Sequence, residues 1–258
     1  YSNYGDKAGA GILIQGQMTI NSSTIADNGV VSYYSVEGGG IYVGGTLTIS
    51  GSTIRDNQVN GDRNGGFGGG IGGHGSLTII DSLVSGNTAS DHYYATGAGI
   101  HTTGPLTIID STFLDNDASA YYTAGAGLDA TGQTMVTGST FTGNSAQTYY
   151  SEYEPYGSSG GAIRNRGNMT ITNSTLSGNG AISGGGIANY GDLTLSNATV
   201  SNNSSGVYST CNNSFGNSIT RLQRSVLSGN NGEEVRRLAQ SGCTTAVNAN
   251  SQNLFGHN

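Results

Sequence analysis

The chain has 258 residues, of which 34% are hydrophobic and 45 are glycine, and its 9 basic and 16 acidic side chains give a net charge of −7. Four of the nine basic residues lie in one C-terminal stretch and nothing basic is expected to line the repeats described below, so the composition argues against nucleic acid as a partner. No apolar run approaches about 18 residues, which predicts that this chain has no membrane-spanning segment.

A unit of roughly thirty residues returns seven times along the chain. Each copy has a Gly-rich triplet, an apolar residue, a short β-patterned run and a closing asparagine, as in Gly38–Ile41 followed by Ser52–Asn57. The step between copies varies from 24 residues (Ile163 to Ile187) to 35 residues (Leu128 to Ile163), whereas the distances inside a unit are constant. Such a period is typical of a solenoid in which each position stacks on its own copy.

Each unit contains short runs in which apolar and polar residues alternate, such as Leu47 and Ile49 alternating with Thr46 and Thr48. This period of two predicts strands, and the glycines that open every unit argue against helices. We therefore predict an all-β fold, a parallel β-helix (solenoid) with about three strands per coil and about eight to nine coils. It forms one domain over residues 1–258, with regular coils over about 9–230 and irregular C-terminal coils over 204–258.

Several columns of equivalent residues are predicted to stack along the axis. One inward apolar column is Ile25, Ile54, Val84, Phe113, Phe141, Leu176 and Val200, and another is Met18, Leu47, Leu77, Leu106, Met169 and Leu193. The closing asparagines are interpreted as a structural ladder at a corner: Asn28, Asn57, Asn87, Asn116, Asn144, Asn179, Asn203 and Asn230. A serine column is interpreted as a hydroxyl ladder rather than as nucleophiles: Ser23, Ser52, Ser82, Ser111, Ser139 and Ser174.

The two cysteines, Cys211 and Cys243, are separated by 32 residues, which is close to one coil. Consecutive coils would bring them together, so a disulfide is favoured over two free thiols and would imply an oxidising compartment. The four histidines are not paired with cysteine at the spacing of zinc ligands. No cofactor is expected.

Tyrosine doublets recur in the insertions between units. The candidate contact residues are Tyr33, Tyr34, Tyr93, Tyr94, Tyr121, Tyr122, Tyr149, Tyr150, Tyr153 and Tyr156. These insertions are the only irregular surface expected. They project from the same corner of successive coils, so the tyrosine rings should form a line along one edge of the rod. Exposed tyrosine suits protein interfaces and sugar stacking, whereas the alternative is that the rings cover the flank of the rod.

Two pairs of carboxylates occupy equivalent positions of adjacent coils: Asp81 with Asp110, and Asp27 with Asp56. They are candidates for calcium binding or for a catalytic acid pair, and the alternative is that they belong to a solvated surface. The segment Gly72–Gly75 contains the Gly-His-Gly found in polygalacturonase-like hydrolases, but their clustered aspartates are absent, and no arginine or lysine is expected beside the acidic pairs. No catalytic residues are therefore assigned.

The repeats resemble the GGAI and FxxN repeats of polymorphic outer-membrane-protein-type, right-handed β-helix proteins. The matching motifs are Gly160–Ile163, Phe113–Asn116 and Phe141–Asn144, and the similarity covers residues from about 9 to 230. The resemblance implies a right-handed single-stranded β-helix and a surface-displayed or secreted passenger domain, often adhesive, without implying a ligand. It fades near the C-terminus, where Glu233–Ala239 is expected to be a decorated loop or one helical turn.

These observations predict an extracellular structural or adhesive rod, a cell-surface adhesin or a filament subunit, with the tyrosine loops as its contact surface. The expected partners are other copies of the chain, a glycan or a cell-surface ligand. The alternatives are a polysaccharide-active enzyme, like a pectate lyase or a glycoside hydrolase, and a carbohydrate-binding module. The chain opens within a repeat and without a signal peptide, which predicts that an export signal has been removed or that the chain is a fragment.

Overall fold

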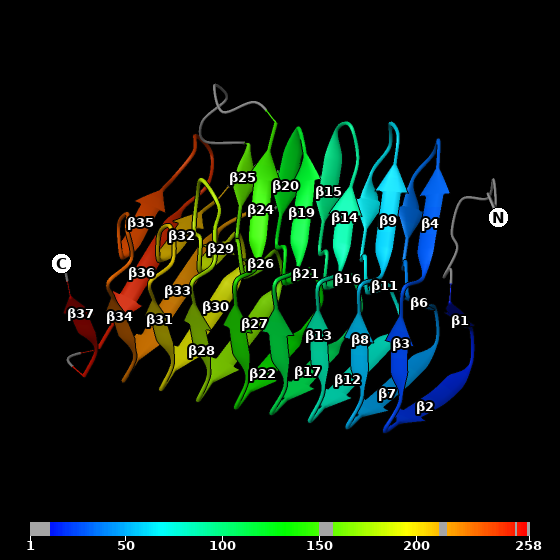
Figure 1. The fold of residues 1–258 in the computed structure, drawn as a ribbon. Coiled ribbons are helices and arrows are strands. Elements are labelled where there is room, and N and C mark those ends of the chain that lie inside the picture. Colours follow the sequence, from blue (N-terminus) through cyan, green and yellow to red (C-terminus); the bar gives the residue numbers. More distant parts are fainter. Residues whose placement is uncertain (1–10, 150–156, 212–215, 251, 257–258) are drawn as a thin grey trace.

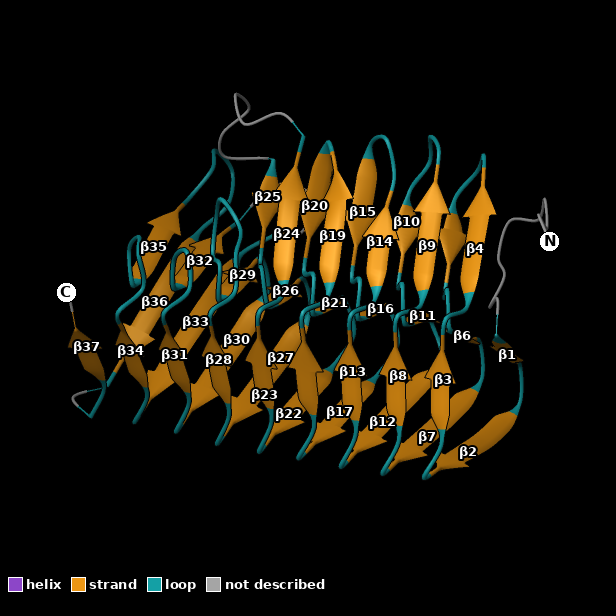
Figure 2. Cartoon of the chain, in the orientation of Figure 1, coloured by secondary structure: helices purple, strands orange, loops and turns teal. Residues whose placement is uncertain are grey.

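The computed structural model describes residues 11–149, 157–211, 216–250 and 252–256. In these residues the chain forms 37 strands and no helix (Figure 2). Successive strands run along the three sides of a coil, and the coils stack into a rod (Figure 1). The chain is therefore an all-β, right-handed parallel β-helix with three main strands per coil, as the repeat predicted. No helix in the described residues has the length and apolarity needed to cross a bilayer.

Three nine-stranded parallel sheets form the sides of the rod. The first sheet contains β1 (Ile12–Ile14), β6 (Ile41–Val43), β11 (Ile71–Gly73), β16 (Ile100–Thr102), β21 (Leu128–Ala130), β26 (Ile163–Asn165), β29 (Ile187–Asn189), β32 (Val207–Thr210) and β35 (Val235–Leu238). The second contains β2 (Gln17–Asn21), β7 (Thr46–Ser50), β12 (Ser76–Ile80), β17 (Leu106–Ile109), β22 (Thr134–Thr137), β27 (Asn168–Thr172), β30 (Asp192–Ser196), β33 (Ser218–Gln223) and β36 (Thr245–Ala249). The third contains β3 (Thr24–Ala26), β8 (Thr53–Arg55), β13 (Leu83–Ser85), β18 (Thr112–Leu114), β23 (Thr140–Thr142), β28 (Thr175–Ser177), β31 (Thr199–Ser201), β34 (Val226–Ser228) and β37 (Leu254–Gly256).

The predicted apolar columns lie in register and fill the rod. Ile54 pairs with Ile25 on one side and Val84 on the other, and the column continues through Phe113 to Leu227. Phe113 and Phe141 stack with ring centroids 4.4 Å apart. All of these residues belong to one continuous core cluster. In the second apolar column Thr134 takes the place of an apolar residue, and Met18 on the first described coil is 39% exposed.

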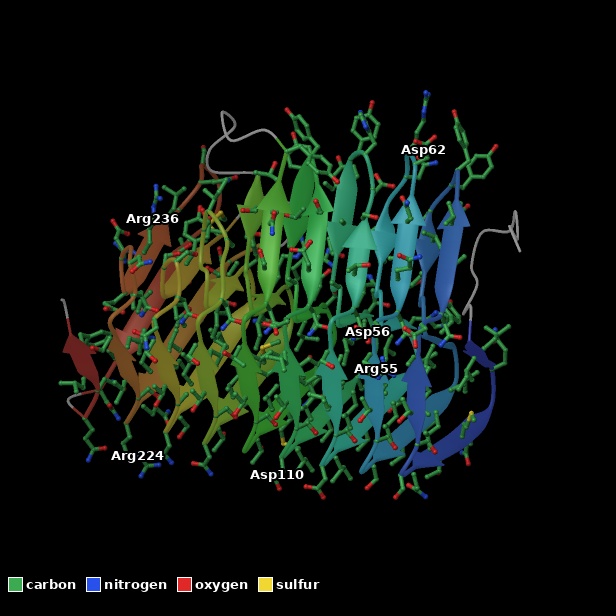
Figure 3. The ribbon with its side chains drawn as sticks, in the orientation of Figure 1. Arg55, Asp56, Asp62, Asp110, Arg224 and Arg236 are labelled. Atoms are coloured by element: carbon green, nitrogen blue, oxygen red, sulfur yellow. A yellow bond between two sulfur atoms is a disulfide. The ribbon has the colours of Figure 1, made fainter. Side chains whose placement is uncertain are left out.

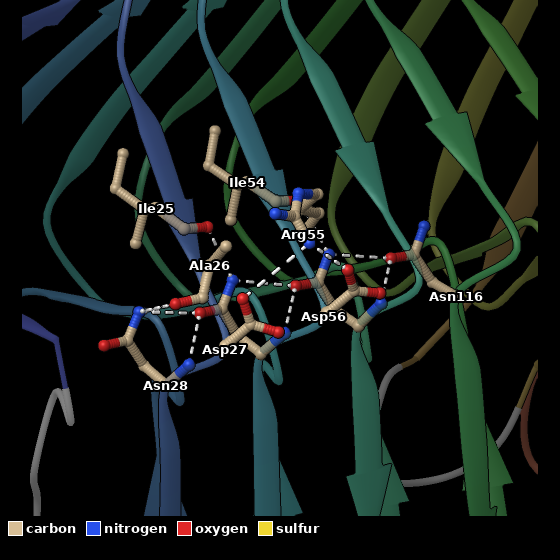
Figure 4. A network of polar contacts seen from close by, with 10 residues as sticks. Ile25, Ala26, Asp27, Asn28, Ile54, Arg55, Asp56 and Asn116 are labelled. Atoms are coloured by element: carbon tan, nitrogen blue, oxygen red, sulfur yellow. Dashed lines mark hydrogen bonds and ion pairs between the residues drawn. The ribbon is translucent and has the colours of Figure 1, made fainter.

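Two polar ladders hold the corners of the third sheet. The last asparagine of the predicted ladder, Asn230, donates to Glu234, whereas from Asn28 to Asn203 each asparagine donates from Nδ2 to Oδ1 of the asparagine in the next coil, over 2.8 to 3.0 Å. The same oxygen accepts from the backbone N–H of the previous asparagine, and Nδ2 of Asn57 also donates to the carbonyl oxygen of Ile25 (Figure 4). The serine hydroxyls likewise accept a backbone N–H from the coil before, as Ser82 does from Ser52. The two ladders thereby supply hydrogen-bond partners for the buried backbone N–H groups at these corners.

The insertions between units are not irregular loops, contrary to the sequence prediction. They form two further parallel sheets of five strands each, which stand beside the rod in Figure 1 and which we call the fin. The fourth sheet contains β4 (Gly29–Ser32), β9 (Gln58–Gly61), β14 (Thr88–Ser90), β19 (Asp117–Ala120) and β24 (Ser145–Thr148). The fifth contains β5 (Val36–Glu37), β10 (Gly66–Phe67), β15 (Tyr94–Thr96), β20 (Tyr122–Ala124) and β25 (Ser158–Ser159).

The fin has a small apolar core of its own. It consists of valines and alanines from both sheets, with two alanines from the turns that lead into the first sheet: Val30, Val36, Val59, Ala89, Ala95, Ala98, Ala118, Ala120, Ala126 and Ala146. Small side chains allow the two sheets to pack closely, and no tyrosine takes part in this core. The tyrosine rings therefore lie outside this core.

The C-terminal coils keep the register of the rod. Val207 pairs with Ile187, and Leu222 with Leu195, so the inward positions continue although the glycine triplet is missing. The prediction of a loop or a helical turn at Glu233–Ala239 is wrong. Val235–Leu238 forms β35 and pairs with β32. Pairing with the preceding coil supplies partners for its backbone that an isolated helical turn would lack.

Cys211 and Cys243 are joined by a disulfide, with their Cα atoms 6.0 Å apart. Replacing both by serine is expected to lower the free energy of unfolding of the C-terminal coils by about 2 to 4 kcal/mol, because the bond restricts the unfolded chain. Denaturation monitored with and without a reductant provides the measurement. Reduction of the parent should reproduce the midpoint of the variant, and a midpoint that neither treatment changes would contradict the prediction.

Candidate functional site

The second residue of each strand in the first sheet points away from the core, and its type changes from coil to coil. Strand register places these residues in one column: Leu13, Tyr42, Gly72, His101, Asp129, Arg164, Ala188, Tyr208 and Arg236. Neighbours in such a column lie about 4.8 Å apart, close enough for direct side-chain contact. Its centre brings a histidine, an aspartate and an arginine together.

Asp129 is the hub of this group and is fully buried. Its Oδ1 accepts from Nε of Arg164 over 2.8 Å, and its Oδ2 accepts from Nη2 of Arg164 and from Nη2 of Arg166, each over 2.7 Å. Nδ1 of His101 lies 2.9 Å from the same Oδ2. The two arginine side chains remain only 18% exposed. The carboxylate is therefore held from three sides by charge-assisted hydrogen bonds.

This environment sets the protonation state of Asp129. Burial alone would raise the pKa of the carboxyl group, because a charge is disfavoured away from water. The positive charges of Arg164 and Arg166, with the hydrogen bonds from Arg164 and His101, outweigh that effect and hold the pKa well below its usual range. Asp129 is thus a stable anion, unsuited to act as a general acid.

Glu37 approaches the other side of His101. Its Oε1 lies 3.9 Å from Nε2 of His101, and the carboxylate reaches that place by passing over Gly72. A Cβ atom at Gly72 would lie 2.4 Å from Cγ of Glu37, so this position in the column requires glycine. Phe67, the residue that follows Glu37 in register, packs on the imidazole with ring centroids 5.0 Å apart. His101 is thereby fixed between two carboxylates and an aromatic ring.

A cleft of about 660 Å³ lies where the fin meets the outer face of the first sheet. Residues from the fifth sheet, the first sheet and the turns that follow the first sheet line it: Phe67, Tyr94, Thr96, His101, Thr103, Tyr122, Thr123, Ser159, Arg164, Arg166, Tyr190, Tyr208, Thr210 and Gln240. Its volume is within the range of small-molecule sites. Among these described lining residues there are aromatic, hydroxyl and cationic side chains but no carboxylate.

Two tyrosines form a stacked pair on the fin wall of the cleft. Tyr94 and Tyr122 pair in register, and their ring centroids lie 5.4 Å apart with an angle of 18° between the planes. The equivalent positions in the flanking coils are Gly65 and Gly157, which have no side chain to continue the stack. Tyr94 is half exposed. The pair therefore presents apolar ring surface with polar hydroxyl tips beside the arginines.

The other tyrosines of the predicted set lie near the tip of the fin. Tyr33, Tyr34, Tyr93 and Tyr149 are 45 to 59% exposed, whereas Tyr121 is partly buried against Tyr122. The expected line of rings is interrupted after β9, where Asp62 stands at the tip (Figure 3). The next residue, Arg63, lies over the ring of Tyr33. Tyr150, Tyr153 and Tyr156 lie outside the described residues.

The candidate calcium ligands occupy turns rather than a cavity. Asp27, Asp56, Asp81 and Asp110 are exposed, and their φ angles lie between 47° and 59°. Aspartate tolerates this left-handed conformation, and glycine replaces it at equivalent corners of other coils, as at Gly51. Arg55 lies beside the Asp27 and Asp56 pair, contrary to the expectation that no cation stood there (Figure 4). No group of three metal-ligating side chains occurs in the described part of the chain.

The Gly-His-Gly segment serves the packing of the first sheet. Nδ1 of His74 lies 3.1 Å from the hydroxyl of the buried Tyr42, and Gly72 makes room for Glu37. The arrangement that the sequence prediction missed lies farther along the same side of the rod, at His101, Asp129, Arg164 and Arg166. The expectation that nothing basic lines the repeats is wrong, because both arginines belong to the cleft.

Comparisons of the chain with protein-family models, with curated proteins and with solved structures found no match. The fold and the repeat therefore define its class, a parallel β-solenoid repeat protein.

Proposed function

We propose that this chain is an extracellular adhesive β-helix that binds glycans through the cleft between the fin and the first sheet. One observation carries the proposal: the stacked pair of Tyr94 and Tyr122 borders a cleft of about 660 Å³ with hydroxyl and guanidinium groups beside it. Sugar rings offer apolar C–H faces and many hydroxyl groups, and such a wall complements both. The rod itself is the rigid support that holds this wall in place.

An export route and a surface location belong to the same proposal. The disulfide between Cys211 and Cys243 supports an oxidising compartment. The motifs at Gly160–Ile163 and Phe141–Asn144 support the finer assignment to polymorphic outer-membrane-protein-type passenger domains. In that setting the β-helix would present its cleft at a distance from the cell.

The chemistry of the cleft favours binding over hydrolysis. Glycoside hydrolysis generally requires two carboxyl groups beside the bond that breaks, one of them a proton donor. The described lining residues supply none, and the nearby Asp129 is buried, ion-paired and held ionised. We therefore prefer a glycan-binding protein to a polysaccharide-active enzyme as the proposed function.

A second candidate function is self-association through the tip of the fin. Tyr33, Tyr34 and Tyr149 are 45 to 59% exposed there, and they are separate from the cleft lining. Exposed tyrosine is enriched at protein interfaces, so a neighbouring copy of the chain would suit this edge. The two surfaces can be tested independently because they share none of these residues.

The cleft variant Tyr94→Ala/Tyr122→Ala is expected to weaken glycan binding about tenfold or more, because it removes the stacked wall. The tip variant Tyr33→Ala/Tyr149→Ala is the matched control, since it removes two exposed rings outside the cleft and should bind as the parent does. Binding is measured by calorimetry with oligosaccharides selected on a glycan array, after circular dichroism has shown that both variants are folded.

Three outcomes would count against this function. A parent that binds no glycan on the array contradicts it directly. A loss of binding confined to the tip variant would move the contact surface to the tip of the fin. Release of reducing or unsaturated ends from a bound oligosaccharide would favour the enzyme instead.

A further inference from the structure

We propose, on the basis of the glycan-binding function above, that the sugar bound in the cleft is anionic and carries a carboxylate or a sulfate group that Arg164 and Arg166 recognise. The first support is the local charge. Both arginines line the cleft, whereas the carboxylate that pairs with them does not. The triad of Arg164, Arg166 and Asp129 has one more positive than negative charge, on a chain whose net charge is −7.

The second support is the hydrogen-bonding capacity of Arg164. Asp129 accepts from Nε and Nη2 of this side chain, and a guanidinium has further N–H donors beyond those two. Because these donors lie in one plane, they fit the paired oxygens of a carboxylate or sulfate. Arg164 therefore suits a bridging role, with Asp129 on one side and the anionic group of the sugar on the other.

Asp129 acts here as a positioning residue. It is fully buried and binds both guanidinium groups within 2.7 to 2.8 Å, so the arginines are ordered before any ligand arrives. Ordering long side chains in advance removes part of the entropic cost of binding. The two guanidinium groups would repel each other, and the carboxylate between them offsets this repulsion and keeps them close together.

The cleft also has a direction along the rod. Relative to Asp129, His101 and its neighbour Glu37 on β5 lie on the N-terminal side along the rod, and Arg164 lies on the C-terminal side. Tyr122 and Asp129 belong to one coil, on β20 and β21, and Arg164 belongs to the next, on β26. A sugar ring against Tyr122 would thus present its anionic substituent to the coil that carries the arginines, away from Glu37.

A nucleic acid is the competing polyanion, and the charge distribution disfavours it. Affinity for a polynucleotide comes from neutralising many phosphates along an extended basic surface. This chain has nine basic residues in total, and those that line the cleft form a single spot. One or two anionic groups on a sugar match that spot, whereas a phosphate backbone would need many more cationic contacts than this spot supplies.

Calorimetry with three probes tests the inference on the parent protein: a galacturonic acid trimer, its fully methyl-esterified counterpart, and a sulfated disaccharide. The acid and the ester have the same rings but differ in charge. We expect the acid to bind at least about tenfold more tightly than the ester at low salt, and the difference to shrink as salt is added. The sulfated probe distinguishes sulfate from carboxylate recognition.

Arg164→Gln is expected to weaken binding of the preferred anionic probe about 10- to 100-fold, while binding of the neutral ester stays within about twofold. Arg164→Lys, which keeps the charge but loses the planar pair of donors, should fall between the parent and Arg164→Gln. Arg221→Gln is the matched control, because Arg221 pairs with Asp192 over the second sheet, outside the cleft. It should bind as the parent does.

The outcomes separate this inference from the function beneath it. Equal binding of acid and ester by the parent would leave the glycan-binding function intact and overturn the anionic preference. Tighter binding of a single-stranded oligothymidylate than of either anionic sugar would overturn the choice of ligand class. A parent that binds no oligosaccharide at all would overturn both proposals.

Discussion

Replacing Ile54 by aspartate is expected to lower the free energy of unfolding by about 4 kcal/mol or more, because the new carboxylate would be buried without a partner. Ile54 is fully buried on β8 and lies in register between Ile25 and Val84, so its surroundings on the core side are apolar side chains. The loss includes the apolar packing of isoleucine as well as the cost of placing a charge there. Chemical denaturation followed by far-ultraviolet circular dichroism measures the effect.

Thr53→Asp on the same strand is the control for the substitution of Ile54. Thr53 points outward and is partly exposed, so its carboxylate would remain hydrated. We expect a cost within about 1 kcal/mol, which is the range of strand propensities. Similar losses for both variants would show that the alternation of inward and outward positions on β8 is wrong.

The sequence was sufficient to predict the rod because its stabilising contacts repeat. An inward residue such as Ile54 touches its own copies in the coils before and after, so selection for packing makes the column visible as a period. The same reasoning applies to the asparagines, each of which needs the next asparagine as its acceptor. These parts of the fold are confirmed by the strand register.

The fin was not predicted, because its core is built from small residues in segments of unequal length. Val59 and Ala89 are equivalent in β9 and β14, but an alternation of alanine and serine gives little hydrophobic signal. The tyrosine doublets nearby are more conspicuous than this core and led to the expectation of loops.

The cleft was missed for the opposite reason, since its residues are the ones that do not repeat. His101, Asp129 and Arg164 each follow the apolar residue that begins a unit, at a position where the side chain points outward. The apolar residue before this position has nearly the same type in every unit, whereas the residue at this position changes. That variation was the sequence signal for function. The apolar anchors Ile100, Leu128 and Ile163 define the repeat, whereas the residue after each anchor carries the chemistry.

Asp129→Asn is expected to lower the free energy of unfolding by about 3 to 5 kcal/mol at neutral pH, because it leaves Arg164 and Arg166 close together without their shared anion. Asparagine has nearly the same shape, so the change isolates the charge. Asp192→Asn is the matched control, since the Asp192 side chain is only half buried and lies 3.8 Å from Arg221. An exposed pair of this kind contributes about 0 to 1 kcal/mol.

The pH dependence of this difference supplies the decisive measurement. The pKa of Asp129 is held well below its usual range in the folded chain, so at low pH the unfolded chain takes up the proton first. The stabilisation by the ionised carboxylate is complete above the unfolded pKa of about 3.9 and is lost as the pH falls through the lower folded value. The parent and Asp129→Asn should therefore differ most near pH 7 and converge in acid, whereas a difference that stays constant down to the acid limit would assign the loss to packing rather than to charge.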